Sequence, residues 1–455
     1  MSYTEKGISA VRRFVHGIVT ATRQDEPERE PVVIGRSEHN VSRKKISKNA
    51  LKVLYRLNEA GYESYLVGGG VRDILLEKNP KDFDISTDAS PEQVKALFKN
   101  CRLIGRRFRL AHVVFGREII EVATFRAAHT TGDGGVTGET GRIVRDNVYG
   151  GTLADDAFRR DFTVNGLYYD ISDFSVIDFF DGVDDLHNGL LRFIGPAKER
   201  VIEDPVRALR AARFAAKLNF SLEDDVLQAI SEEHHRLADI PPARMFEEAL
   251  KLFQSGYGKA SFAWLRDLDL LSYLLPLTDA RLKSGDTYAD KLTELALVNT
   301  DRRIKQDMPV TPAFIYAVML WPDVAERAAK YEKDEGMPPV PALHKAADDV
   351  IPQQLAATSL PKRFSIPMRE IWTLQPRLRK TRGKRAMQLI GNPRFRAAYD
   401  FLLLRCEAGE SDLAPLCATW EKLQQHPEAQ AAIESARKAP RPNRRKRAPR
   451  KRTPD

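Results

Sequence analysis

Apolar runs of the length of a β-strand are frequent between residues 47 and 126 of this 455-residue chain. The runs "ESYLV", "FRLAHVVFG" and "EIIEVATF" are rich in β-branched and aromatic residues and are separated by short turns. Two helical patterns lie among them, one beginning at Ser47 and ending at Gly61, the other with Ser90 as its N-cap. Because strands and helices mix within so short a segment, the pattern predicts a small α/β unit with a mixed sheet.

Helical spacing of apolar residues takes over from about residue 155 and continues to about residue 435. The segments "EDPVRALRAARFAAKL" and "PPARMFEEALKLFQSG" have apolar positions three and four apart, and beyond residue 280 prolines split the helical pieces. The exception is "FSVIDFFDGVDDLHNGLLRFIG", residues 174–195, which has the pattern of a β-hairpin. The predicted fold class is therefore α+β: a small N-terminal head with a mixed β-sheet, followed by a long all-α body.

The net charge of +9 comes from the C-terminal end of the chain. Residues 437–455 contain ten Lys or Arg and one acidic residue, which leaves 62 basic and 62 acidic residues in the remainder. A segment so charged and so poor in apolar residues cannot bury a core, so we predict a disordered tail. Its positive charge favours an arm that binds phosphates, with a purely solubilising tail as the alternative.

Other bulk features indicate where the protein works. No apolar run approaches the length of a membrane span, and the N-terminus lacks the small-residue cleavage site of a secretory signal. Residues 1–46 are polar and lack periodicity, so we expect a partly disordered leader. The cysteines, Cys101, Cys406 and Cys417, lack metal-ligand spacing and indicate free thiols in a reducing compartment. These features predict a cytoplasmic protein.

Two carboxylates, Asp82 and Asp84, stand two residues apart where the strand "FDIST" is expected to begin. Because side chains alternate along a strand, both should emerge on the same side. Neighbouring carboxylates repel each other unless a cation lies between them, and Mg²⁺ is bound through one or two carboxylates plus substrate phosphates. The pair predicts a magnesium site, with a solvated turn as the alternative.

Three glycines, Gly68 to Gly70, precede a predicted helix over residues 71–77. Glycines at that point let backbone N–H groups approach an anion, which the helix dipole also attracts. Arg72 can add charge beside a triphosphate, with Asp73 holding it in place. The alternative is a plain tight turn; neither the P-loop pattern nor the dinucleotide-binding pattern is present.

A third acid is expected on an adjacent strand. Glu121 lies among apolar residues in "EIIEVATFR", where an ionised group needs a partner. A place in the metal site and a salt bridge with Arg126 would both satisfy it, and the sequence leaves the two open.

The segment "RRDFTVNGLYYD" places Arg160, Asp161 and Asn165 on what we expect to be one helix. The acid and the amide are four residues apart and would share a face, with the arginine adjacent. Such a cluster can hydrogen-bond a ribose and hold a phosphate. The alternative is a surface ion pair between Asp156 and Arg159 or Arg160.

The segment "EDPVRALRAARF" opens another helix and repeats charged residues every three positions, at Asp204, Arg207 and Arg210. Such residues are expected to share a face. An aspartate can accept from an exocyclic amino group while an arginine donates to the neighbouring ring nitrogen. That pattern fits adenine and cytosine equally, and a structural N-cap with ion pairs is the alternative.

Taken in order, "LVGGGVRD", "DFD", "RRDFTVNGLYYD" and "EDPVRALRAARF" resemble the class II nucleotidyltransferase superfamily, in the branch with bacterial poly(A) polymerases and tRNA CCA-adding enzymes. The resemblance extends from about residue 47 to about residue 400. Within the branch, "LIGRRFRLAHV" is similar to the bacterial poly(A) polymerases, as are "FRAAYDFLLLR" and the Arg/Pro-rich tail.

The resemblance implies a template-independent transfer of AMP from ATP to RNA 3′ ends, with two Mg²⁺ ions, for which Mn²⁺ can substitute. It places Asp161 in the active site with Asp82 and Asp84, gives Arg160 and Asn165 contacts with the nucleotide sugar, and makes "EDPVRALRAARF" a protein-borne template. RNA and ATP are the expected partners of a monomer, and RNA-decay or RNA-chaperone proteins stay open as further partners.

The resemblance also implies a division of the chain. We expect a leader (1–46), a nucleotidyltransferase head (47–170), a neck that binds the base and RNA (171–275), a helical RNA-binding body (276–436) and the tail (437–455). A tRNA CCA-adding enzyme is the alternative with the same catalytic motifs, and a non-catalytic RNA-binding protein is the alternative of another class.

Overall fold

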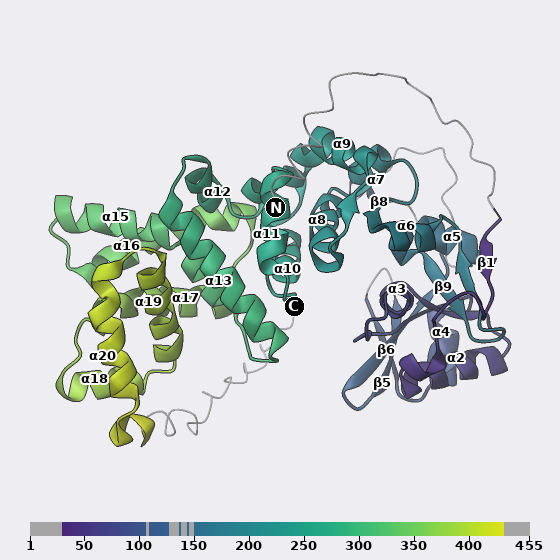
Figure 1. Cartoon of the computed structure of the whole chain (residues 1–455), viewed down its shortest axis with the longest axis horizontal. Helices are drawn as coiled ribbons and strands as arrows, with labels where there is room; N and C mark the ends of the chain where they lie inside the picture. The colour runs from purple at the N-terminus through teal and green to yellow at the C-terminus, as the bar shows by residue number, and fades with distance from the viewer. Residues whose placement is uncertain (1–29, 106–108, 127–135, 138–142, 145–149, 432–455) are drawn as a thin grey trace, which may run out of the picture.

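A mixed sheet lies at one end of an elongated molecule and a stack of helices at the other (Figure 1). The computed structural model describes residues 30–105, 109–126, 136–137, 143–144 and 150–431. The predicted tail falls outside these ranges, and the predicted leader is described only from residue 30 onward. Within the described part of the chain, no helix is both long enough and apolar enough to cross a membrane.

The sheet has eight strands in the order β1-β10-β9-β2-β3-β6-β5-β4, and every neighbouring pair is antiparallel except β3 and β6. The predicted mixed sheet is thus confirmed. It takes in β1 from the expected leader and β10 from the expected neck, because β1 pairs along β10 at one edge. The strands are β1 (Val32–Ile34), β2 (Ser64–Val67), β3 (Asp84–Thr87), β4 (Cys101–Ile104), β5 (Leu110–Phe115), β6 (Glu118–Thr124), β9 (Leu167–Asp170) and β10 (Val176–Asp178).

Helices cover one face of the sheet. The serine caps predicted for α2 (Lys48–Glu59) and α4 (Pro91–Leu97) are confirmed, since Ser47 and Ser90 each accept a backbone N–H of the first turn. Ile85 and Val122 on this face are buried in the same core as the apolar residues of both helices. The opposite face of the sheet is the one that carries the candidate site.

The neck links the head to the body, and one prediction fails there. Residues 174–195 form a strand, a helix and a second strand, because β11 (Leu190–Leu191) pairs in parallel with β12 (Ser221–Leu222) and not with β10. The remaining elements are α3 (Gly69–Leu75), α5 (Leu153–Phe158) and the 3₁₀ turn η2 (Thr163–Asn165) in the head, and α6 (Gly182–Asn188), α7 (Ala197–Glu203), α8 (Val206–Leu218), α9 (Asp224–Glu233), α10 (Pro242–Phe253) and α11 (Gly258–Asp267) in the neck. A second small sheet pairs β7 (Val136–Thr137) with β8 (Ile143–Val144).

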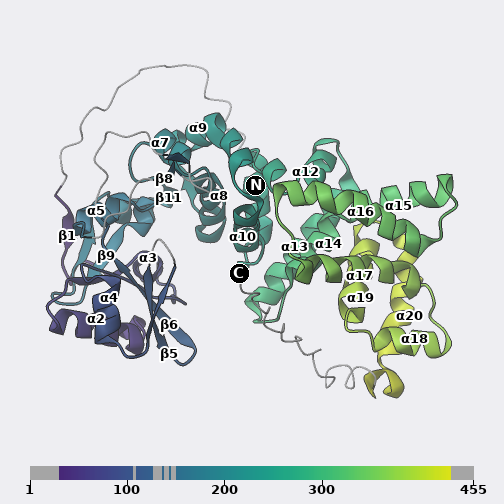
Figure 2. The same ribbon diagram turned by 180° about the vertical axis from the view of Figure 1, so that it is seen from behind.

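The body is a layered stack of nine helices in the described chain, seen from behind in Figure 2. Trp372 and Trp420 are fully buried and donate their indole N–H groups to backbone carbonyls at 2.8 Å, so both are core residues. All three cysteines are unpaired. The helices are α12 (Pro276–Lys283), α13 (Thr287–Lys305), α14 (Pro312–Met319), α15 (Trp321–Asp334), α16 (Pro339–Ala357), α17 (Lys362–Leu378), α18 (Gly383–Ile390), α19 (Phe395–Ala408) and α20 (Ala414–Gln424).

Candidate active site

Two exposed carboxylates mark the start of β3. Asp84 is the first residue of the strand, and Asp82 precedes it by two positions, outside the strand proper. Desolvation, repulsion from Glu121 and repulsion from Asp82 together raise the pKa of Asp84 to about 6, against the opposing pull of Arg160. The two carboxylates are therefore close enough to repel each other, although only one of them belongs to the strand.

Glu121 corrects an expectation about burial. Its register partner on β3 is Asp84, and its side chain is about half exposed (49%), because this part of β6 faces outward on the site-bearing face. Its carboxylate lies 3.4 Å from His112 on β5, the residue directly opposite. His112 is therefore one partner of Glu121, and the salt bridge with Arg126 stays a prediction.

These carboxylates suit a magnesium ion that the substrate helps to bind. Among the described residues, no three His, Cys, Asp or Glu side chains converge closely enough to form a preformed metal cluster. Mg²⁺ does not require one, because it keeps several waters and is held by one or two carboxylates plus phosphate oxygens. Two neighbouring acids, neither bonded to another described side chain, fit that ligand set.

The glycine turn begins α3 two residues earlier than predicted. Gly68 is the N-cap, with φ 69° and ψ −128°, a conformation that in practice only glycine adopts. Gly69 and Gly70 lie in the first helical turn, where backbone N–H groups have no partner within the helix. A Cβ on Gly70 would lie 3.7 Å from the carbonyl oxygen of Asp82, so the turn lies directly beside the acidic pair.

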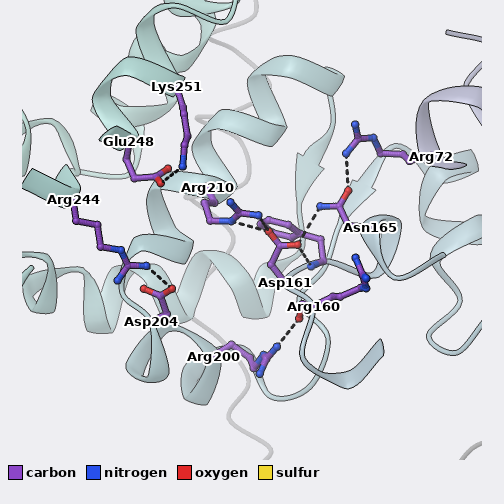
Figure 3. A network of polar contacts seen from close by, with 11 residues as sticks. Arg72, Arg160, Asp161, Asn165, Arg200, Asp204, Arg210, Arg244, Glu248 and Lys251 are labelled. Carbon is purple, nitrogen blue, oxygen red and sulfur yellow. Dashed lines mark hydrogen bonds and ion pairs between the residues drawn. The ribbon is translucent and has the colours of Figure 1, made fainter. Parts of the chain in front are cut away.

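Arg72 is buried and starts a chain of polar contacts that joins the head to the neck (Figure 3). Asp73 accepts hydrogen bonds from Arg72 at 2.6 and 2.8 Å, as expected for a residue that holds the guanidinium in place. Arg72 also donates to the Asn165 side chain at 2.6 Å, and Asn165 donates to Asp161 at 3.1 Å.

The expectation that Arg160, Asp161 and Asn165 lie on one helix is wrong. Helix α5 ends at Phe158, and Asn165 belongs to the separate turn η2. The polypeptide folds back between them, because the backbone N–H of Thr163 and the carbonyl of Asp161 pair with residues 192 and 194. The predicted contact between the acid and the amide nevertheless forms, through this fold-back instead of through helical spacing.

Asp161 is tightly held. Arg210 of α8 donates to it through Nε at 2.8 Å and also through Nη2. Burial alone would raise the pKa of Asp161, but Arg210, together with the donors Asn165 and Phe162 N–H, holds that pKa below its usual value. The carboxylate is therefore ionised and fully engaged in connecting the head to α8.

Arg160 is fixed on the site-bearing face of the sheet. It donates to Asp156 at 2.8 Å, to Ser86 at 3.0 Å and to the Tyr168 hydroxyl at 2.9 Å. Although burial opposes its charge, Tyr168 and Asp156 raise the pKa of Arg160. The ion pair with Asp156, which was the alternative interpretation, exists but is largely buried, and it holds Arg160 close enough to oppose the rise in the pKa of Asp84.

The segment "EDPVRALRAARF" spans a junction and not a single helix. Asp204 ends α7 as its C-cap, and α8 begins at Val206. Asp204 accepts from Arg244 of α10 at 2.7 Å, whereas Arg207 is buried and donates to Glu203 at 2.7 Å. The three residues of the repeat thus contact three different elements, and the expectation of one shared binding face is wrong for Arg207.

Sequence reasoning overlooked the continuation of this repeat. Arg213 extends the three-residue spacing along α8, and Lys217, four residues further on, lies 3.8 Å from Asp73. The Arg213 guanidinium lies 4.4 Å from the Phe214 ring, and its buried Nε has no hydrogen-bond partner. The three-residue period that singled out Arg207 and Arg210 was the available signal.

Comparison with known proteins agrees with this arrangement. Three family profiles match, described as "Poly A polymerase head domain" over residues 64–192, "Probable RNA and SrmB- binding site of polymerase A" over residues 219–282, and "Polymerase A arginine-rich C-terminus" over residues 335–452. The chain is 47% identical to poly(A) polymerase I of Salmonella typhimurium over 430 residues, which cover 93% of this chain and 92% of the relative.

CCA-adding enzymes are similar over a shorter length. One from Lactobacillus johnsonii is 40% identical over 204 residues, which cover 45% of this chain and 49% of the relative. A crystal structure of the Bacillus stearothermophilus CCA-adding enzyme in complex with CTP matches with a TM-score of 0.50 and 25% identity, covering 85% of this chain and 82% of that one.

Proposed function

Since the chain belongs to the bacterial poly(A) polymerase family of nucleotidyltransferases, we propose that it adds AMP from ATP to RNA 3′ ends without a template, in reactions that promote RNA decay. The observation that carries the proposal is the adjacency of two features. An exposed pair of carboxylates lies at the start of β3, and a glycine turn with two anchored arginines lies beside it.

The triphosphate would lie along the glycine turn. Gly68 shapes the turn while its own N–H donates to the Leu167 carbonyl at 3.2 Å, so Gly69 and Gly70 are the glycines that offer backbone N–H groups. Arg72 and Arg160 supply positive charge from fixed positions. Because both guanidiniums are anchored before substrate binds, little side-chain entropy is lost when the phosphates arrive. Asn165 and Asp161, in the contact chain behind Arg72, would orient the sugar.

Asp82 and Asp84 would hold Mg²⁺, with Mn²⁺ as a substitute and Glu121 as an additional ligand across the register from Asp84. The bound ions would lower the pKa of the attacking 3′-hydroxyl and neutralise the departing pyrophosphate. The side chains of this protein would contribute alignment: the carboxylates would hold the metal, and Arg160 would attract the phosphates.

The base would be recognised near Asp204, Arg207 and Arg210. All three make protein contacts in this structure, with Arg244, Glu203 and Asp161 respectively. Base binding would therefore share or exchange these contacts, and it would select against G and U by hydrogen-bond pattern. RNA would be held by its backbone. The regions that would bind it are the helical body, the family-matched region 219–282 and the basic tail. The reaction would take place in the cytoplasm, where ATP and RNA meet.

The deciding experiment supplies each NTP separately, with Mg²⁺, to the full chain and a generic oligoribonucleotide. We expect long products with ATP only. A second substrate, tRNA that lacks its terminus, tests the CCA-adding alternative. That alternative is supported by the similarity to the Lactobacillus johnsonii CCA-adding enzyme. Two additions from CTP would favour that alternative, and no incorporation of any nucleotide would favour a non-catalytic RNA-binding protein.

A further inference from the structure

One register row crosses the site-bearing half of the sheet. Asp84 on β3 pairs with Glu121 on β6, Glu121 pairs with His112 on β5, and His112 pairs with Arg102 on β4. Directly paired residues project to the same face, so these four side chains stand in line. Neighbouring strands are about 4.8 Å apart, which puts Arg102 about 14 Å from Asp84.

Charge changes sign along this row. It begins with the carboxylates of Asp84 and Glu121, passes His112, which lies 3.4 Å from Glu121, and ends with the exposed cation Arg102 at the sheet edge. A row of this kind suits a ligand that binds, at one end, the metal held by the carboxylates and that carries negative charge opposite Arg102 at the other end.

Apolar side chains flank the row on the same face. Ile119 pairs with Val114 on one side, and Ile104 pairs with Leu110 on the other. Ile119 and Ile104 are each 47% exposed, whereas the opposite face of these strands is buried in the core. Exposed apolar groups beside cations on a sheet face can bind the unstacked bases and phosphates of single-stranded RNA.

The direction of attack also points to this face. Helix α3, whose first turn holds the triphosphate in the proposed function, packs against β2 and β9 on one side of β3. In-line displacement requires the attacking oxygen to approach opposite the leaving pyrophosphate. The side left for that approach is the one formed by β6, β5 and β4.

We propose that the face formed by Arg102, Ile104, His112, Val114 and Ile119, here called the primer face, docks the last nucleotides of the acceptor RNA. This inference rests on the proposed function and adds the route by which the 3′-hydroxyl reaches Asp84. A protein covering the same face would block that route, which favours RNA as the occupant. Both views place β5 and β6 on the side of the head toward the helical body, so RNA held by the body can continue onto this face (Figures 1 and 2).

The test uses the full chain, saturating ATP with Mg²⁺ and a labelled oligoadenylate primer. Arg102→Glu and Ile119→Asp change exposed side chains, so folding should persist, which a melting curve checks. We expect each variant to raise the primer KM about tenfold, with the KM for ATP and the kcat at saturating primer unchanged. Val33→Asp, on the far edge strand of the same sheet and also exposed, and Lys52→Glu, an exposed cation on α2 at the helix-covered face, are the matched controls.

A second measurement separates this inference from the proposed function. A primer with a photoreactive 3′-terminal base is cross-linked without ATP, and the labelled peptide is identified by mass spectrometry. Cross-links within residues 100–104 or 110–121 support the primer face even for a protein without transferase activity. An unchanged primer KM in an active enzyme, or cross-links confined to the neck and body, would overturn the inference and leave the face to a protein partner.

Discussion

The acidic residues at the start of β3 and those where the head meets the neck have opposite environments. Asp82 and Asp84 are exposed and repel each other, and the pKa of Asp84 is raised to about 6. Asp161 and Asp204 are buried beside arginines, and the pKa of Asp161 is lowered. Among the described residues, no cationic side chain forms an ion pair with Asp82 or Asp84, whereas Asp161 is paired with Arg210 and Asp204 with Arg244.

This difference separates two roles that sequence motifs alone would merge. A carboxylate repelled by its neighbours gains most from a metal ion, because the ion removes the repulsion. A carboxylate that already accepts two N–H groups of Arg210 on one oxygen has little to gain, and removing it would leave a partly buried cation without its ion-pair partner. This contrast supports the proposal that the chemistry takes place at the strand end and that the buried acids at the junction with the neck position the arginines.

The largest expected effect comes from Asp84→Asn. Loss of one metal-binding carboxylate should lower AMP incorporation on the order of 10³-fold, equivalent to about 4 kcal/mol. The melting temperature without metal should stay the same or rise, because the variant removes a carboxylate repelled by Glu121 and Asp82. Single-turnover incorporation and thermal melting measure the two quantities.

Asp88→Asn, an exposed acid just beyond the other end of β3, is the matched control and should keep full activity. RNA binding by Asp84→Asn should equal that of the unchanged protein. Substantial AMP incorporation by Asp84→Asn would show that the chemistry does not depend on this carboxylate. It would also contradict the difference in role between the strand end and the neck.

Asp161→Asn should instead lose stability. Its ion pair with Arg210 is buried on the acid side and about one-third exposed on the arginine side, so we expect a loss of about 2 kcal/mol in the free energy of unfolding. The folded-state pKa of Asp161 is lowered, so its contribution is present above about pH 4 and is lost as pH falls through the folded-state value. Urea denaturation over a series of pH values should show the full difference from the unchanged protein at pH 7, a difference that begins to shrink below about pH 4, and none once the pH is below the folded-state pKa.

A double-mutant cycle with Arg210→Gln isolates the pair from other effects of each substitution. Equal stability of Asp161→Asn and the unchanged protein at pH 7, combined with loss of AMP incorporation, would move Asp161 into the chemical centre. The neck would then no longer differ from the strand end.

Local pattern predicted much of the fold. Alternation and turn signals located β2 through β6, and serine caps located α2 and α4, because these features depend on residues close in sequence. The segment 174–195 failed because β11 takes a partner more than 30 residues later in the chain, which no local pattern encodes.

The residues of the candidate site could be predicted from the sequence, but their arrangement in space could be predicted less well. The motif residues Arg72, Asp161, Asn165 and Arg210 do form one network, but through a fold-back that joins separate turns and helices. Arg207 follows the same three-residue spacing as Asp204 and Arg210, yet it donates to Glu203 of α7. It can reach that residue because α8 begins only at Val206, directly after α7 has ended. The burial of Glu121 was misjudged since both of its sequence neighbours are apolar, while only one face of β6 is covered.

Arg213 supplies the smallest predicted effect and the exception within the neck. Desolvation, reinforced by Arg210, lowers the pKa of Arg213 to about 10, and no described carboxylate is bonded to it. Its charge therefore opposes folding at neutral pH, unlike the charge of Arg210, which is compensated by Asp161.

Arg213→Met, which keeps the apolar stem over Phe214, should raise the free energy of unfolding by about 1 kcal/mol. Arg213 lies close enough to Arg72 and Arg210 to be repelled by both, with partial compensation from Glu248 and Asp161, so these arginines form a region of positive charge and we expect the same variant to weaken ATP binding a fewfold. Urea denaturation and the KM for ATP measure the two effects, with Lys333→Glu as an exposed-cation control. If Arg213→Met were destabilised and bound ATP normally, Arg213 would have an ordinary packing role, and every charge in the neck would serve the scaffold.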